Sequence, residues 1–95
     1  MSVRILGKKV RAAYAVYAHS NNDGIFYIGS GGCSRAFRAE GRSHPWLSRA
    51  SDVVHCDILQ TFTSKSKSID YEGEMINLFS NNNLVNIRRP KRDWR

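Results

Sequence analysis

The chain has 95 residues, of which 41% are hydrophobic and 11% aromatic, and this composition is typical of one small globular domain. Fifteen Lys and Arg residues against eight Asp and Glu give a formal net charge of +7, a surplus that favours a polyanionic partner such as nucleic acid. The sequence excludes a disulfide framework and a zinc site, because Cys33 and Cys56 have no Cys or His neighbour at zinc spacing.

The chain divides into a core and two basic ends. We predict a single domain over residues 1–95, with its core at about residues 14–87, a basic arm at residues 1–13 and a basic tail at residues 88–95. No sustained apolar run begins the sequence, so we expect no signal peptide, no membrane partner and a reducing, cytoplasmic location. The basic residues of the arm either contact backbone phosphates or only keep the arm soluble, and the sequence favours neither.

A β-hairpin is predicted near the start of the core. Two short runs of strand-forming residues, Tyr14–His19 and Ile25–Gly29, flank a turn segment that contains Asn-Asn and Asp-Gly. These turn residues tolerate positive φ, which makes this pattern a strong hairpin signal. Alternation along the strands directs Tyr17 to one face of the first strand and Tyr27 to one face of the second. Ordinary packing in the sheet is the alternative role for both tyrosines.

An arginine-bearing segment follows the second strand and its glycine turn. Residues 34–40 predict a short helix, on which Arg35, Arg38 and Arg42 share one stripe if the helix continues far enough. Such a stripe is commonly a solvated face. Here it begins after a turn whose backbone amides can also meet a phosphate. Two phenols and a guanidinium therefore form a candidate centre for handling phosphate.

A second short helix is predicted next. Pro45 suits its first turn, with Ser43 or His44 near the N-cap, and Trp46 is expected to pack in the core. His44 lies in a polar loop near the arginine segment, where an imidazole can assist proton transfer. A capping or solvent-facing role for His44 is equally consistent with the sequence.

The second half of the core contains a strand at residues 53–62 and a helix at residues 68–79. Glu72 falls within the apolar stripe of this helix, whereas Glu74 lies on its outer face. A carboxylate on the inward face is costly without a partner, which would be an arginine, a tyrosine or a metal ion. A structural ion pair with Arg35 or Arg38 is the alternative to a metal site.

The chain resembles the GIY-YIG nuclease module. Tyr27–Gly29 matches the second half of that motif letter for letter, whereas Ala15–Tyr17 keeps the tyrosine but has Ala for Gly and Val for Ile. Arg35 corresponds to the arginine of the following helix and Glu72 to the metal-binding glutamate. Asn86 matches the asparagine that ends the core of the family, for which we expect a structural role in ordering the site. The resemblance covers residues 14–86, nearly the whole chain.

The order of predicted elements gives an α/β fold, with a three-stranded, mostly antiparallel sheet flanked by helices in the order β-β-α-(α)-β-α. The resemblance implies a metal-dependent DNA endonuclease that hydrolyses phosphodiester bonds. In this scheme Glu72 holds Mg²⁺ or Mn²⁺ and Arg35 holds a non-bridging phosphate oxygen. Tyr17 orients or deprotonates the attacking water, with Tyr27 and His44 in the proton path.

DNA is the expected partner. Candidate contacts to it come from the arginine segment and from the basic tail: Arg38, Arg42, Arg88, Arg89, Lys91 and Arg92. Two alternatives remain, a non-catalytic DNA- or RNA-binding module and a basic interaction protein with a structural Glu–Arg pair. The sequence does not identify the DNA target. It also leaves open whether the protein forms a homodimer or uses a partner that supplies specificity, and whether its role is homing, restriction, repair or phage competition.

Overall fold

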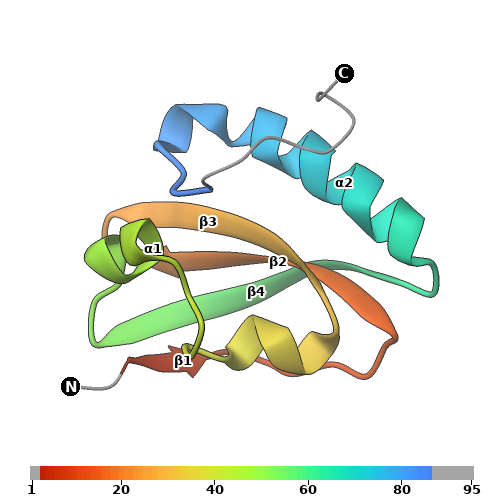
Figure 1. The fold of residues 1–95 in the computed structure, drawn as a ribbon, viewed down its shortest axis with the longest axis horizontal. Coiled ribbons are helices and arrows are strands. Elements are labelled where there is room, and N and C mark those ends of the chain that lie inside the picture. Colours follow the sequence, from red (N-terminus) through yellow and green to blue (C-terminus); the bar gives the residue numbers. More distant parts are fainter. Residues whose placement is uncertain (1–2, 87–95) are drawn as a thin grey trace.

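The computed structural model describes residues 3–86, which form a four-stranded mixed sheet with helices on both faces (Figure 1). The order of the strands across the sheet is β1-β4-β2-β3. The strands are β1 (Arg4–Leu6), β2 (Tyr14–Asn21), β3 (Gly24–Gly31) and β4 (Val53–Phe62). The helices are the 3₁₀ helix η1 (Cys33–Phe37), α1 (His44–Arg49), α2 (Lys65–Leu78) and the 3₁₀ helix η2 (Ser80–Asn82).

The predicted hairpin is confirmed. β2 and β3 pair antiparallel, and each extends further than the sequence indicated. Gly24 adopts a φ of +111°, which an L side chain rarely tolerates, and the backbone N–H of Asp23 donates to Asn21 Oδ1 at 2.9 Å. The turn chemistry therefore fixes the register of the hairpin, in which Tyr17 lies opposite Gly29.

The α/β class is confirmed, but the predicted three-stranded sheet is wrong because β1 adds a fourth strand. β4 pairs antiparallel with β2 as expected, whereas β1 pairs in parallel with the start of β4. β1 has only three residues, too few to show an alternation of apolar and polar side chains, and its partner residues in β4 begin at Val53. Pairing over such a separation leaves no local signal in the sequence.

The two faces of the sheet are covered by different elements. Val16, Ala18 and Ile28 form a buried cluster against which side chains of α2 pack. Tyr17 points to the other face, where Ala36 of η1 packs against it. In Figure 1, η1 and α1 lie in front of the sheet, and α2 runs along β3 at its upper edge.

The arginine segment differs most from its prediction. Instead of a helix over residues 34–40, it forms a short 3₁₀ helix that ends at Phe37, and Arg38 is extended with φ −108° and ψ 132°. Gly41 then has a φ of +78°, which turns the chain before α1. Arg35, Arg38 and Arg42 consequently share no helical stripe.

The remaining helices follow their sequence signals more closely. α1 begins after the N-cap Ser43, whose Oγ accepts from the backbone N–H of Trp46 at 3.4 Å, with a proline in its first turn. α2 begins earlier than predicted, because Ser64 caps it and the Ser- and Lys-rich segment joins the helix. None of the helices between residues 3 and 86 combines the length and apolar composition needed to cross a lipid bilayer. The predicted contacts in the basic tail lie outside the described residues.

Candidate functional site

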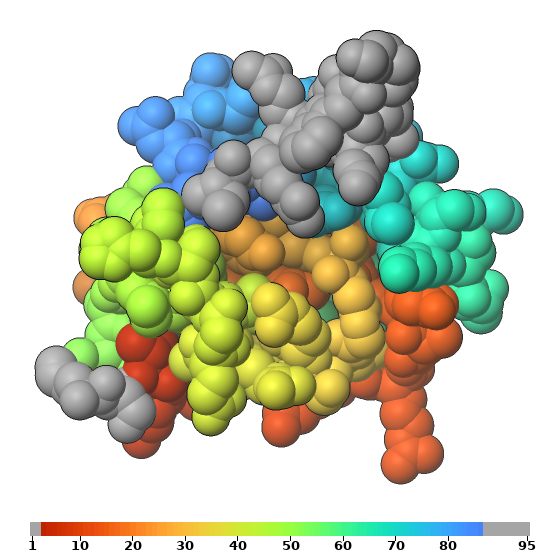
Figure 2. Space-filling view, viewed as in Figure 1, coloured from red at the N-terminus to blue at the C-terminus, as the bar shows by residue number. Residues whose placement is uncertain are grey.

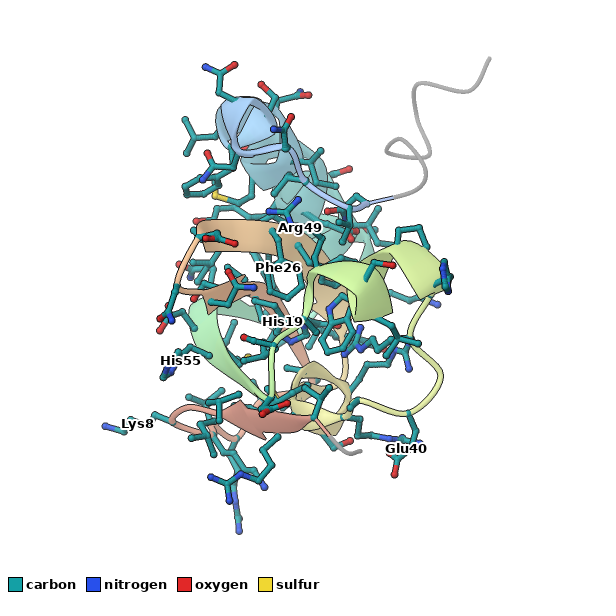
Figure 3. The ribbon with its side chains drawn as sticks, turned by 90° about the vertical axis from the view of Figure 1, so that its left-hand side faces the viewer. Lys8, His19, Phe26, Glu40, Arg49 and His55 are labelled. Atoms are coloured by element: carbon teal, nitrogen blue, oxygen red, sulfur yellow. The ribbon has the colours of Figure 1, made fainter. Side chains whose placement is uncertain are left out.

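A cluster of five side chains lies between the sheet and the η1–α1 side of the molecule: Tyr17, His19, Tyr27, Arg42 and Trp46. We call it the tyrosine–arginine cluster. Its residues come from β2, β3, the loop after η1, and α1. Figure 3 shows His19 in the interior, between the strands and α1.

The hairpin sets the distance between the two tyrosines. The ring centroids of Tyr17 and Tyr27 are 6.3 Å apart, with Tyr17 1% exposed and Tyr27 half-buried. Gly29 lies opposite Tyr17, and a Cβ at this position would come within 2.7 Å of the Tyr17 hydroxyl and of the Tyr27 ring. The glycine of the YIG tripeptide is therefore required because both rings occupy the space of its missing side chain.

His19 is locked as a neutral imidazole. Its Nδ1 accepts from Trp46 Nε1 at 3.0 Å, and its Nε2 lies 2.7 Å from the carbonyl oxygen of Ala36. An indole N–H only donates, so Nδ1 is unprotonated and Nε2–H is the donor to Ala36. Burial, and secondarily the charge of Arg42, lower the pKa of His19 to about 4. His19 therefore joins β2 to η1 and α1 without carrying charge at neutral pH.

Arg42 occupies the centre of the cluster. Its guanidinium carbon is 5.9 Å from the Tyr17 ring centroid, 5.4 Å from that of Tyr27 and 5.6 Å from that of Trp46. Its Nε donates to the carbonyl of Arg38 at 2.9 Å and its Nη2 to that of Arg35 at 2.6 Å. The side chain is only 8% exposed, so the predicted position on a solvated helical stripe is wrong, whereas the predicted contact to nucleic acid stays a prediction.

The charge of Arg42 has no acidic partner within residues 3–86. It is offset there by two carbonyl dipoles, by the faces of aromatic rings and by a long contact of 3.5 Å from Nη1 to the Tyr17 hydroxyl. A buried cation is costly unless it is well compensated, and π faces and carbonyls compensate only part of a full charge. The cluster is therefore a centre of positive potential that favours an anion nearby.

The environment of Tyr17 keeps its phenol protonated. Burial, with the neighbouring Tyr27 as a smaller contribution, raises the pKa of Tyr17 to about 12, although Arg42 and Arg35 act in the opposite direction. Ionisation at pH 7 would cost roughly 7 kcal/mol, at about 1.36 kcal/mol for each pKa unit. Tyr17 is therefore suited to hold Arg42 in place rather than to act as a resident base.

The other predicted residues of this segment lie at the surface. Arg35, Arg38 and His44 are exposed. The guanidinium of Arg35 lowers the pKa of Tyr17 electrostatically, which places its charge near the cluster. Ser43, not His44, caps α1.

Glu72 lies beside the same strand as Tyr27 but on its other side. Its Oε1 accepts from Ser30 Oγ at 3.0 Å, and the side chain is half-buried. Ser30 alternates with Gly29, so its side chain points to the face opposite Tyr27. The structure thus brings Tyr17, Tyr27 and Arg42 together on one face, and places the Glu72 carboxylate across β3 from them.

The end of β3, between the tyrosine–arginine cluster and the Glu72 carboxylate, is uncovered by residues 3–86 at Gly31 and Gly32. Cβ atoms built at Gly31 and Gly32 would meet no atom of residues 3–86 within 4 Å. Figure 2 shows the light-orange atoms of β3 at the surface, between the yellow-green η1–α1 segment and the cyan α2. Residues 3–86 therefore leave space for a ligand beside these two glycines.

Asn86 binds the outer edge of β3. Its amide nitrogen donates to the carbonyl of Ile28 at 2.6 Å, and its Oδ1 accepts from the backbone N–H of Ile28 at 3.1 Å. The backbone N–H of Val85 donates to the carbonyl of Phe26 at 2.7 Å. These contacts hold the segment after η2 against the strand that carries Tyr27.

The sequence alone did not identify Trp46 and Ser30 as neighbours of the candidate site, and it placed Arg42 on a helical stripe rather than among the aromatic rings. A signal exists for Trp46 only, since an indole in an otherwise polar loop predicts burial with a hydrogen-bond acceptor. Comparison of the chain with protein-family models, with curated proteins and with solved structures finds no match. The function must therefore be argued from the residues of the site.

Proposed function

We propose that the chain is a metal-dependent DNA endonuclease that hydrolyses phosphodiester bonds, as its resemblance to the GIY-YIG nucleases implies. The observation that carries the proposal is Arg42, a buried guanidinium beside two tyrosines with no acidic partner among residues 3–86. Such a centre favours the negative charge of a phosphodiester. The space that residues 3–86 leave beside Gly31 and Gly32 would let a nucleic-acid backbone approach this end of β3.

The roles that we assign to the residues in and around the cluster follow from their burial. Arg35, which is exposed, would contact a non-bridging oxygen directly, and Arg42 would add its charge from beneath. Tyr27 is half-buried, so its hydroxyl is better placed than that of Tyr17 to orient the attacking water. Tyr17 would position Arg42 through its hydroxyl. His44 remains a candidate for proton transfer from the surface of α1.

The donor set for a metal is small. Residues 3–86 contain no group of three or more His, Cys, Asp or Glu side chains able to hold a metal ion. Mg²⁺ commonly binds through one or two carboxylates and completes its shell with water and substrate phosphate oxygens. Glu72 with Ser30 beside it fits this weakly held, substrate-dependent type of site, with either Mg²⁺ or Mn²⁺. The ion would neutralise charge on the phosphate and the leaving oxygen.

A second candidate is a nucleic-acid-binding module without catalytic activity. Two observations favour it: burial raises the pKa of Tyr17 to about 12, and Ser30 holds Glu72 on the face of β3 opposite Tyr27. Both candidates use the positive charge of the cluster. They differ in whether Glu72 acts on the same phosphate as Arg42.

The test is nicking of supercoiled plasmid in Mg²⁺ or Mn²⁺ by the wild type, Glu72→Gln and Glu74→Gln. Glu74 is exposed on the same helix, so Glu74→Gln removes the same charge away from Ser30. We expect the wild type and Glu74→Gln to nick the plasmid, and Glu72→Gln to lose at least 100-fold in rate. DNA binding by the wild type without nicking in either metal would replace this proposal with the binding module.

A further inference from the structure

Residues 7–13 of the N-terminal arm lie beside η1. Cys33 Sγ donates to the carbonyl of Ala12 at 3.3 Å, and the Nζ of Lys9 lies 5.5 Å from the centroid of the Phe37 ring. Gly7 also approaches this ring, since a Cβ there would lie 3.3 Å from it. Figure 1 shows the segment between β1 and β2 running beside η1. Two contacts and the close approach of Gly7 therefore hold residues 7–13 beside the helix.

This packing creates a basic surface that neither segment has alone. Lys9 of the arm and Arg35 and Arg38 of the η1 segment are all exposed. We call these three residues the η1 patch. The arm over residues 7–13 and the segment over residues 33–38 contain no Asp or Glu, so no acidic residue within either segment offsets the charge.

The η1 patch is continuous with the tyrosine–arginine cluster. The backbone carbonyls of Arg35 and Arg38 accept the hydrogen bonds of the buried Arg42 guanidinium. The side chain of Arg35 is near enough to lower the pKa of Tyr17. A polyanion held at the cluster therefore meets the patch next. If Lys9, Arg35 and Arg38 were only solvated surface residues, there would be no reason for their segment to adjoin the buried charge of Arg42.

We propose that the η1 patch binds the sugar–phosphate backbone of a nucleic acid, leading it from the tyrosine–arginine cluster across η1 to the N-terminal arm. The inference rests on the proposed function only for the class of partner, and it requires no cleavage. It assigns Lys9, whose segment had no assigned role, to phosphate contact. It also assigns a direction to the bound nucleic acid, which would run from the cluster towards the N-terminal arm and away from α2.

Two other exposed lysines, Lys8 and Lys67, provide matched controls for Lys9. Lys8 adjoins Lys9 in the sequence, is exposed, and in Figure 3 extends to the side opposite Glu40, which lies in the loop after η1. Lys67 is exposed on α2. Replacement of any of the three by Gln lowers the net charge of +7 by one. Differences between these variants therefore report position and not total charge.

The experiment measures binding of a fluorescein-labelled DNA duplex by anisotropy in EDTA, over a range of salt concentrations. We expect Lys9→Gln and Arg38→Gln each to weaken binding about eight-fold in 0.1 M salt and about three-fold in 0.3 M salt, because one phosphate contact contributes about 0.9 to the salt slope. Lys8→Gln and Lys67→Gln should stay within two-fold of the wild type. Lys9→Arg should keep the affinity, because it keeps the positive charge that contacts the phosphate.

Equal effects of Lys8→Gln and Lys9→Gln would overturn the inference, since binding would then follow total charge. Absence of any duplex or single-strand binding by the wild type would also overturn it. The proposed function can fail separately. If the wild type never nicks plasmid but Lys9→Gln weakens DNA binding as expected, nucleic-acid binding by the η1 patch is supported and the endonuclease activity is refuted.

Discussion

His19 makes the stability of the domain depend on pH between about 6.5 and 4. The imidazole is fully buried, with its two nitrogens used by Trp46 and Ala36. Protonation of Nδ1 would remove the acceptor of the Trp46 N–H and place a second charge near Arg42. Burial therefore lowers the pKa of His19 from 6.5 to about 4 in the folded state. The unfolded chain binds a proton at pH 6.5, and the folded chain does so only near pH 4.

The sign and size of the effect follow from proton linkage. Between pH 6.5 and about 4 the unfolded state carries more protons, so the free energy of unfolding falls as the pH falls. The two pKa values differ by 6.5 minus about 4, or about 2.5, which at about 1.36 kcal/mol for each pKa unit gives a full loss of about 3 kcal/mol. At pH 4.5 the loss is about 2 kcal/mol, equivalent to roughly 10 °C in melting temperature for a domain of this size.

The groups around His19 do not share this titration. Burial raises the pKa of both Tyr17 and Cys56 to about 12, and Arg42 stays charged throughout. Urea unfolding of the wild type at pH 7.0 and pH 4.5, compared with His19→Gln, measures the contribution of His19. We expect the difference between the two pH values to shrink by about 2 kcal/mol in the variant. His44→Gln, at an exposed position, serves as the control.

Two results would refute this reasoning. The first is an unchanged pH dependence in His19→Gln. The second, which needs no variant, is an NMR titration of the wild type in which the ring protons of His19 shift with a midpoint near 6.5. Either would mean that the imidazole accepts a proton in the folded state at little cost, contrary to its burial and its hydrogen bonds.

Two substitutions test the packing of β3. Gly29→Ala should destabilise the fold by about 1–3 kcal/mol, because its Cβ would overlap the tyrosine rings, whereas Gly32→Ala, which has open space, should change the melting temperature little. Equal melting temperatures for the two variants would contradict the close contact. Asn86→Ala should cost about 1–3 kcal/mol and speed hydrogen exchange at the Ile28 amide, with Asn81→Ala, at an exposed position, as the control. Unchanged exchange at Ile28 would show that this hydrogen bond does not persist in solution.

Local chemistry explains which elements the sequence could predict. The hairpin follows from turn residues that accept positive φ, and α1 follows from a serine cap and a proline within three positions. β1 could not be found in this way, because three residues form a strand only when β4 is already beside them. The sequence pattern was sufficient where the cause of the structure lay within a few residues.

Arg42 shows what the sequence could not predict about the candidate site. Helical periodicity placed it on a solvated stripe, but Gly41 turns the chain and sends the guanidinium between rings from β2, β3 and α1. Its neighbours are far apart in the sequence, so their meeting is a property of the tertiary fold. The tyrosine pair was predictable because both rings belong to one hairpin.

The contacts of Val85 and Asn86 have a consequence for self-association. β3 is an outer strand of the sheet, and unpaired N–H and C=O groups on such a strand are a template for adding another chain. Here the segment after η2 occupies the carbonyl of Phe26 and both backbone groups of Ile28. The opposite edge, β1, is only three residues long. The described part of the chain therefore offers little free edge for a continuous sheet between two copies.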